Sequence, residues 1–258
     1  MASLADLRQR RLRELRLTPD RALQTLEEAA AFLAERGMLT LTQDSALPSL
    51  FAACHEEPYK KGAKGFGSWP KTKYPWAFQL AERTDVLALK VHRGKVLLCT
   101  PAVCRAVDPL ARAALAEAEK APDERARLVR HLGSAGPTTI DDVKMELGLP
   151  PQTLRAVREK LESLAAVVAR ETLVPDSKGG HRHTSELRRW DQAWKKPWRA
   201  TEDAALAELA ILGVRAAVLA HEDEVAKFFS WPIEKALLGE LVRAGRLARA
   251  GPGWLAAP

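Results

Sequence analysis

The segment from His55 to Trp76 is the part of the chain in which cationic and aromatic side chains alternate most densely. Lysine ammonium groups neutralise phosphates, while aromatic rings stack on bases or wedge between them. The segment interleaves lysines with large aromatic residues: Lys60, Lys61, Lys64, Lys71 and Lys73 with Tyr59, Phe66, Trp69, Tyr74 and Trp76. This pattern predicts a nucleic-acid contact in which the lysines bind phosphates and Trp69 and Tyr74 lie against bases or sugars. The alternative is a small aromatic core beneath a long loop, with lysines that are only solvated.

A second set of candidate contacts follows Pro150-Pro151, which begin a predicted helix with an apolar stripe of leucine and valine. Its other face and the hairpin after it are basic. We expect DNA contacts from Gln152, Arg155, Arg158, His181, Arg182, His183 and Arg188. The alternative is a small domain of the same topology that contacts protein.

His181 and His183 share one face of a predicted strand, a spacing that a metal site could use. No cysteine lies nearby to complete a zinc set, so no metal is expected. The sequence also lacks a Walker A loop, a dinucleotide-binding fingerprint and a GxSxG motif, so no cofactor is expected. A hairpin histidine that touches the DNA backbone is the preferred interpretation.

The elements that carry these residues follow the order of a winged helix-turn-helix between Asp123 and Thr184. A first helix ends at Gly133, a second is capped by Thr139 and ends at Gly148, a third runs to Leu164, and a hairpin follows. We expect a further helix from Ser185 to about Lys196 that carries Trp190 and Trp194. If the helical spacing extends to Trp198, the three tryptophans line one face, in a core role. A recognition helix of this kind fits the DNA major groove, and its hairpin reaches the flanking backbone.

The remaining chain predicts the same order twice more, without a residue-level repeat. In the first copy, Thr25 caps a helix that ends at Gly37, a strand covers 38–42, and Asp44 or Ser45 caps the next helix. The expected fold is mainly α with small β-hairpins (α+β), as three tandem winged helices. The chain is expected to begin with a basic N-terminal helix (1–17). Winged helices follow at 18–101, 123–199 and 200–258, and residues 55–72 are an insertion in the first of them. Residues 102–122 form a connector, with a helix from Pro109 to Lys120.

Bulk properties agree with a polyanion partner. The 258 residues carry a net charge of +7 and a pI near 9.4. The three cysteines lack CxxC spacing, no signal peptide is evident, and no stretch reaches the ~20 apolar residues that span a bilayer. We therefore expect a cytoplasmic, nucleoid-associated protein without membrane contact.

At this level the chain resembles the AlkZ/YcaQ family of DNA glycosylases, which are built from tandem winged helices and release alkylated or crosslinked bases. The stretch that carries the resemblance best is the helix end Glu35-Arg36-Gly37 together with the strand that follows it. In the family this strand carries Gln, an apolar residue, then Gln or Asp; the same spacing here falls on Thr40, Leu41 and Thr42. The resemblance implies Gln43 and Asp44, which follow directly, as the candidate catalytic pair. On a strand they would face opposite sides, so acting together requires a bulge.

We expect a protein that binds double-stranded DNA on a concave basic surface, in DNA repair or damage recognition as the resemblance implies. The alternatives are a DNA glycosylase, a winged-helix transcription regulator, which would use dimer symmetry, and an interaction scaffold that does not bind DNA. No small-molecule ligand is expected. A monomer is favoured because no dimerisation helix is evident.

Overall fold

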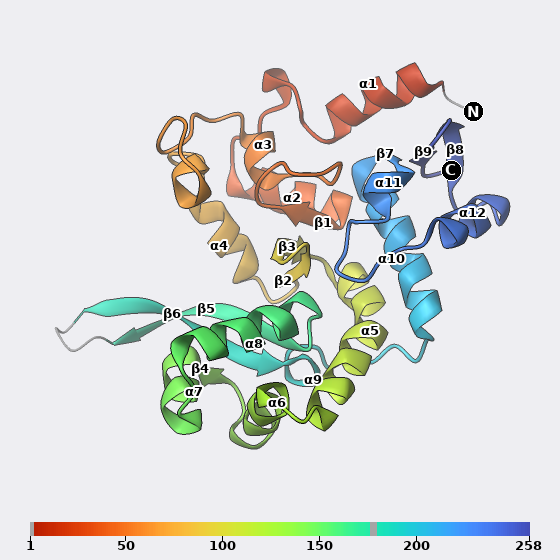
Figure 1. Cartoon of the computed structure of the whole chain (residues 1–258). Helices are drawn as coiled ribbons and strands as arrows, with labels where there is room; N and C mark the ends of the chain where they lie inside the picture. Colours follow the sequence, from red (N-terminus) through yellow and green to blue (C-terminus); the bar gives the residue numbers. More distant parts are fainter. Residues whose placement is uncertain (1–2, 176–179) are drawn as a thin grey trace.

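One order of elements recurs three times along the chain: helix, strand, helix, helix, strand, strand (Figure 1). The computed structural model describes residues 3–175 and 180–258, with the backbone alone for Leu173, Pro175, His181 and Arg182. The first unit consists of α2 (Leu26–Arg36), β1 (Met38–Thr40), α3 (Leu50–Cys54), α4 (Pro75–Ala81), β2 (Leu87–His92) and β3 (Lys95–Cys99). The second consists of α6 (Glu124–Ala135), β4 (Thr138–Thr139), α7 (Ile140–Leu147), α8 (Pro151–Ser163), β5 (Val167–Pro175) and β6 (His181–Arg189). The third consists of α10 (Glu202–Ala217), β7 (Leu219–His221), α11 (Glu222–Val225), α12 (Lys235–Arg243), β8 (Ala248–Gly251) and β9 (Trp254–Ala256).

Each unit has one antiparallel three-stranded sheet in which its last strand, by sequence, lies in the centre. The orders are β1-β3-β2, β4-β6-β5 and β7-β9-β8. The structure is therefore a mixture of helices and small antiparallel sheets, as the sequence predicts.

The remaining elements lie between or beside the units. They are α1 (Leu4–Glu14), the 3₁₀ turns η1 (Pro19–Arg21) and η2 (Gly65–Ser68), α5 (Pro101–Lys120) and α9 (Trp190–Ala193). Helix α5 packs against α6 and α10, so it joins the second unit to the third. Helix α1 packs on β7 and β8, which brings the two ends of the chain to one side of the molecule (Figure 1).

The predicted helix boundaries hold where a local cap decides them. The Thr25 hydroxyl accepts from the amide of Glu28, and Gly37 closes α2 with a φ of 81°. Thr139 and Gly148 do the same for α7. Both glycines take the left-handed conformation that a side chain disfavours.

Four boundary predictions are wrong. The strand predicted over 38–42 ends at Thr40. Helix α3 is capped by Ser49 rather than by Asp44 or Ser45. Helix α5 begins at Pro101 rather than Pro109, and Pro109 lies inside the helix. Helix α6 continues past Gly133 and ends at Ala135.

The predicted helix from Ser185 to Lys196 is also wrong. Strand β6 continues to Arg189, pairing with β5 on one side and β4 on the other, and only Trp190–Ala193 is helical. The β5 ladder covers residues 185–189 and β4 pairs with residues 186 and 187, so strand pairing overrides the local helical pattern. Trp190 is nevertheless fully buried, and Trp194 and Trp198 pack against the same core.

The side chain of Asp108 fixes this region to α5. It is fully buried and accepts hydrogen bonds from Arg112 Nε (2.7 Å), Trp190 Nε1 (2.8 Å) and the amide of Trp198 (2.7 Å). One carboxylate therefore holds α5, α9 and the segment that leads to α10. Over residues 3–175 and 180–258, no helix is both long enough and apolar enough to cross a membrane.

Candidate nucleic-acid interface

The loop between α3 and α4 folds back on itself and is held by its own backbone. The amide of Tyr59 donates to the carbonyl of Trp69 (2.7 Å), and the amide of Lys60 donates to that of Gly67 (2.8 Å). At the loop base, the Glu56 carboxylate accepts from the amides of Thr72 (2.8 Å) and Lys73 (3.1 Å). These bonds give the loop one defined shape, directly before helix α4.

Six rings in and around this loop form a continuous aromatic cluster, which consists of Phe51, Tyr59, Phe66, Trp69, Tyr74 and Phe78. Ring centroids of Phe66 lie 5.1 Å from both Trp69 and Tyr74 and 5.9 Å from Tyr59. Trp69 contacts Phe51 at 5.2 Å and Phe78 at 6.1 Å. These spacings suit favourable tilted and edge-to-face contacts, so the cluster stabilises the loop.

The cluster also has an outer side. Tyr59 is 60% exposed, Phe66 48% and Phe78 37%, whereas Trp69 and Tyr74 are half-buried. Trp69 and Tyr74, the two rings predicted to contact DNA, therefore lie in the inner part of the cluster. The more exposed rings are those of Tyr59, Phe66 and Phe78. Phe78 was missed from the sequence, although Ala77 and Leu80 on the buried face of α4 already direct position 78 outward.

The lysines of the loop divide into two kinds. Lys60, Lys61, Lys64 and Lys71 are exposed, and their ammonium groups make no hydrogen bond or ion pair to any residue that the structure describes. Lys73 instead donates to the carbonyl of Leu23 (2.6 Å) and lies over the ring of Trp76, 5.4 Å from its centroid. Four of the five predicted lysines are therefore available to an anion, and Lys73 supports the loop.

A cleft of about 420 Å³ opens beside the aromatic cluster, between the first and second units. Trp69 and Phe78 line it on one side, with Leu41 and strand β2. Its other wall comes from β5 and includes Val168, Ala169 and Arg170. Arg83, Lys90 and Arg188 add positive charge to the lining, and Glu82, Glu162 and Glu171 add negative charge. No pattern in the sequence indicates this cleft, because its two walls are separated by some eighty residues.

Helix α8 presents its predicted contact residues unequally. Gln152 is exposed, and Arg155 is exposed with its Nε bonded to Glu159 (2.8 Å). Arg158 is only 17% exposed, because its guanidinium donates twice to Glu162 (3.0 and 2.9 Å). Glu162 is 2% exposed and also pairs with Lys90 of β2. The Arg158–Glu162–Lys90 group therefore joins the second unit to the first.

The β5–β6 hairpin extends away from the rest of the chain (Figure 1). His183 is exposed near its end, with Nδ1 3.9 Å from Glu171, while Arg188 at its base pairs with Glu186. The side chains of His181 and Arg182 lie outside the described residues, as do residues 176–179 of the predicted tip. In the described part of the chain, no three His, Cys, Asp or Glu side chains gather as metal ligands.

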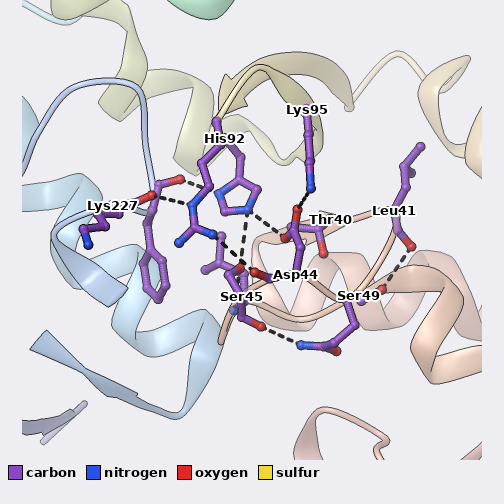
Figure 2. Close-up of polar contacts among 12 residues, drawn as sticks. Thr40, Leu41, Asp44, Ser45, Ser49, His92, Lys95 and Lys227 are labelled. Carbon is purple, nitrogen blue, oxygen red and sulfur yellow. Dashed lines mark hydrogen bonds and ion pairs between the residues drawn. The ribbon is translucent and has the colours of Figure 1, made fainter. Parts of the chain in front are cut away.

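Gln43 and Asp44 lie in the loop between β1 and α3, and they face different partners. Gln43 Nε2 donates to the carbonyl of Ser45 (2.6 Å). The Asp44 carboxylate accepts from His92 Nε2 (3.0 Å) and pairs with Lys95 (Figure 2). His92 in turn donates from Nδ1 to the carbonyl of Phe228, so this group contacts the third unit. Burial raises the pKa of Asp44, but the hydrogen bonds from Lys95 and His92 outweigh burial and leave the pKa below its usual value.

Comparison with known proteins gives one solved structure. No family model matches the sequence, and no curated protein matches it. The chain is similar in structure to the DNA glycosylase AlkZ of Streptomyces sahachiroi, with a TM-score of 0.54 and 14% sequence identity over 99% of this chain and 70% of that one. The fold is AlkZ-like.

Within this AlkZ-like fold, neighbouring residues of the segment Thr40-Leu41-Thr42 lie in different environments. Thr40 is 2% exposed and donates its hydroxyl to the carbonyl of Pro48 (3.1 Å), while Leu41 lines the cleft. Gln43 and Asp44 do not line the cleft. Leu41 and Asp44 are close in sequence, but the turn after β1 separates them. Leu41 lines the cleft, whereas Asp44 contacts His92 and Lys95.

Proposed function

We propose that this protein binds double-stranded DNA and acts in DNA repair or damage recognition. The observation that carries the proposal is the 55–74 loop, which exposes Tyr59 and Phe66 together with four lysines that have no ion pair in the described part of the chain, Lys60, Lys61, Lys64 and Lys71. Ammonium groups without a protein partner can neutralise phosphates at little cost, because no ion pair must be broken. The repair context comes from the likeness to a protein named as a DNA glycosylase.

We further propose that the three units are winged helices. The repeated element order and the common strand order support this assignment. Helix α8 would then be a recognition helix with Gln152 and Arg155 toward DNA, and the β5–β6 hairpin a wing whose predicted contacts are His181, Arg182, His183 and Arg188. The DNA-facing surface would include the first unit's loop and the second unit's hairpin, with the cleft between them.

The experiment is the salt dependence of duplex binding, measured by fluorescence anisotropy. Each phosphate contact adds about 0.9 to the magnitude of the slope of log K against log salt. A variant with Lys60, Lys61, Lys64 and Lys71 changed to alanine should bind more weakly and with a shallower slope, by about 1 or more. The control is Lys227→Ala, an exposed lysine of the third unit that should leave the slope unchanged. A shallow wild-type slope, equal to that of the four-lysine variant, would instead favour an interaction scaffold.

Base excision is a second candidate, favoured by the AlkZ-like fold. Gln43 and Asp44 are its predicted catalytic residues. The test is single-turnover base release from duplexes that carry an alkylated purine or an interstrand crosslink, followed by alkali to cut abasic sites. Cleavage that is lost in Gln43→Ala and Asp44→Asn, at unchanged DNA affinity, would support it. Duplex binding without base release would leave damage recognition as the function.

A further inference from the structure

We propose that the aromatic cluster and the cleft beside it bind an unpaired nucleotide of DNA, so that the preferred substrate contains an extrahelical or single-stranded base. This inference rests on the proposed DNA binding and specifies its substrate class.

The first argument is the concentration of exposed apolar surface. Four large hydrophobic side chains are exposed among the described residues, and three of them, Tyr59, Phe66 and Phe78, belong to this cluster. A patch that gathers such residues and is surrounded by charge is typical of an interaction site. Aromatic faces bind bases by stacking, and every base has a face that can stack.

The second argument is that the rings are already in place. Phe66 is held between Trp69 and Tyr74, both at 5.1 Å, and the loop is closed by backbone hydrogen bonds at Tyr59 and Lys60. A preorganised surface loses little side-chain freedom on binding, which favours affinity. The outer face of Phe66 is therefore a ready platform rather than a mobile side chain.

The third argument is the adjoining cleft. Trp69 and Phe78 belong to both the cluster and the cleft, so the aromatic cluster and the cleft adjoin each other. Its volume of about 420 Å³ is within the ~300–1,000 Å³ of small-molecule sites. Ala77, Val168 and Ala169 give apolar walls, and Thr84 and Ser185 supply hydroxyls that can bond a base edge.

Positive charge flanks both sides of this site. Lys60, Lys61, Lys64 and Lys71 lie on the loop side, and Arg170 is exposed on the β5 side without a side-chain partner in residues 3–175 and 180–258. Phosphates on either side of an unpaired nucleotide would meet these cations. A fully paired duplex keeps its base faces stacked on each other, so it can use the cations but not the rings.

The test compares three labelled DNAs of equal length: a fully paired duplex, the same duplex with a bulged base, and the single strand. Stacking on one aromatic face changes affinity by about tenfold per base. Wild-type protein should bind the bulged duplex about tenfold more tightly than the paired one. The variant with Tyr59→Leu and Phe66→Leu keeps apolar side chains but loses the π faces, so the preference should fall to near unity.

Two further variants locate the site. Ala169→Trp fills the cleft from the β5 wall and should reduce the preference, whereas Lys64→Ala should weaken binding to all three DNAs alike. Emission of 2-aminopurine at the bulged position should fall on binding wild-type protein and not on binding the double leucine variant. Thermal unfolding of each variant establishes that it is folded.

The outcomes separate a failure of this inference from a failure of the proposed function. Paired-duplex binding with no preference for the bulge refutes this inference and leaves the proposed function intact. A preference that survives both the leucine and the Ala169→Trp variants also refutes it, because the base is then held elsewhere. Failure to bind any of the three DNAs refutes the inference and the proposed function together.

Discussion

The Asp44 carboxylate lies 3.0 Å from Nε2 of His92, whose side chain is completely buried. The other ring nitrogen of His92 donates to the carbonyl of Phe228, and the neighbouring Arg93 donates to the carbonyls of Lys227 (3.1 Å) and Asp44 (3.2 Å). The β2–β3 turn of the first unit is thereby fixed to the third unit.

This arrangement predicts that Asp44→Asn lowers stability. The amide would replace one acceptor oxygen by a donor that faces Lys95 or His92, and hydrogen bonds to charged groups are worth about 1.5–3 kcal/mol. We expect a loss of about 1–3 kcal/mol in the free energy of unfolding, measured by urea denaturation. Asp20→Asn, at an exposed position, is the control and should change stability little. An Asp44→Asn protein as stable as wild type would show that the carboxylate does not support the fold.

The same carboxylate predicts a pH dependence. The folded pKa of Asp44 lies below its unfolded value of about 3.9, because the Lys95 and His92 bonds outweigh burial. The stabilisation is therefore fully present above pH ~4 and is lost as the pH falls through the lower folded pKa. The difference in unfolding free energy between wild type and Asp44→Asn should stay constant from neutral pH to about pH 5, then shrink below pH 4. A difference that grew as the solution became more acidic would contradict this assignment.

Asp108 should be among the most sensitive positions of the chain. Its fully buried carboxylate receives three donors, and its removal leaves the Arg112 guanidinium, the Trp190 indole and the Trp198 amide without that partner. Asp108→Ala should reduce the free energy of unfolding by about 3–5 kcal/mol. Asp108→Asn, which keeps one acceptor oxygen, should cost less. Near-UV circular dichroism would report the tryptophan packing, and an unchanged spectrum and stability in Asp108→Ala would contradict the prediction.

Arg155 and Arg158 lie on the same helix, α8, but their substitution is expected to have different effects: on DNA affinity for Arg155 and on stability for Arg158. Arg155 is 76% exposed and Arg158 17%, and Arg158 shares the buried Glu162 with Lys90. Arg155→Ala should lower DNA affinity and leave the melting temperature within a degree or two, since exposed ion pairs contribute ~0–1 kcal/mol. Arg158→Ala should lower the melting temperature, because Glu162 loses a partner in a nearly buried site. Equal stabilities of the two variants would show that the Arg158–Glu162 bond does not stabilise the fold.

The sequence by itself determined the elements whose ends are set within a few residues. Thr25 with Glu28, Thr139 with Asp142, and glycines at 37 and 148 act over one helical turn, so their types and spacing suffice. The same holds for the basic-aromatic composition of the 55–76 segment, which indicated an unusual surface before its shape was known.

Only the tertiary structure decided which polar groups meet. Asp44 and His92 are 48 residues apart, Lys90 and Glu162 are 72 apart, and Asp108 and Trp190 are 82 apart. No local pattern encodes such pairs, because burial and hydrogen-bond partners depend on how whole units pack. Strand β6 extends through residues predicted as helix for the same reason, since two neighbouring strands supply its hydrogen bonds. The cleft that Trp69 and Phe78 line likewise arises where the first and second units meet.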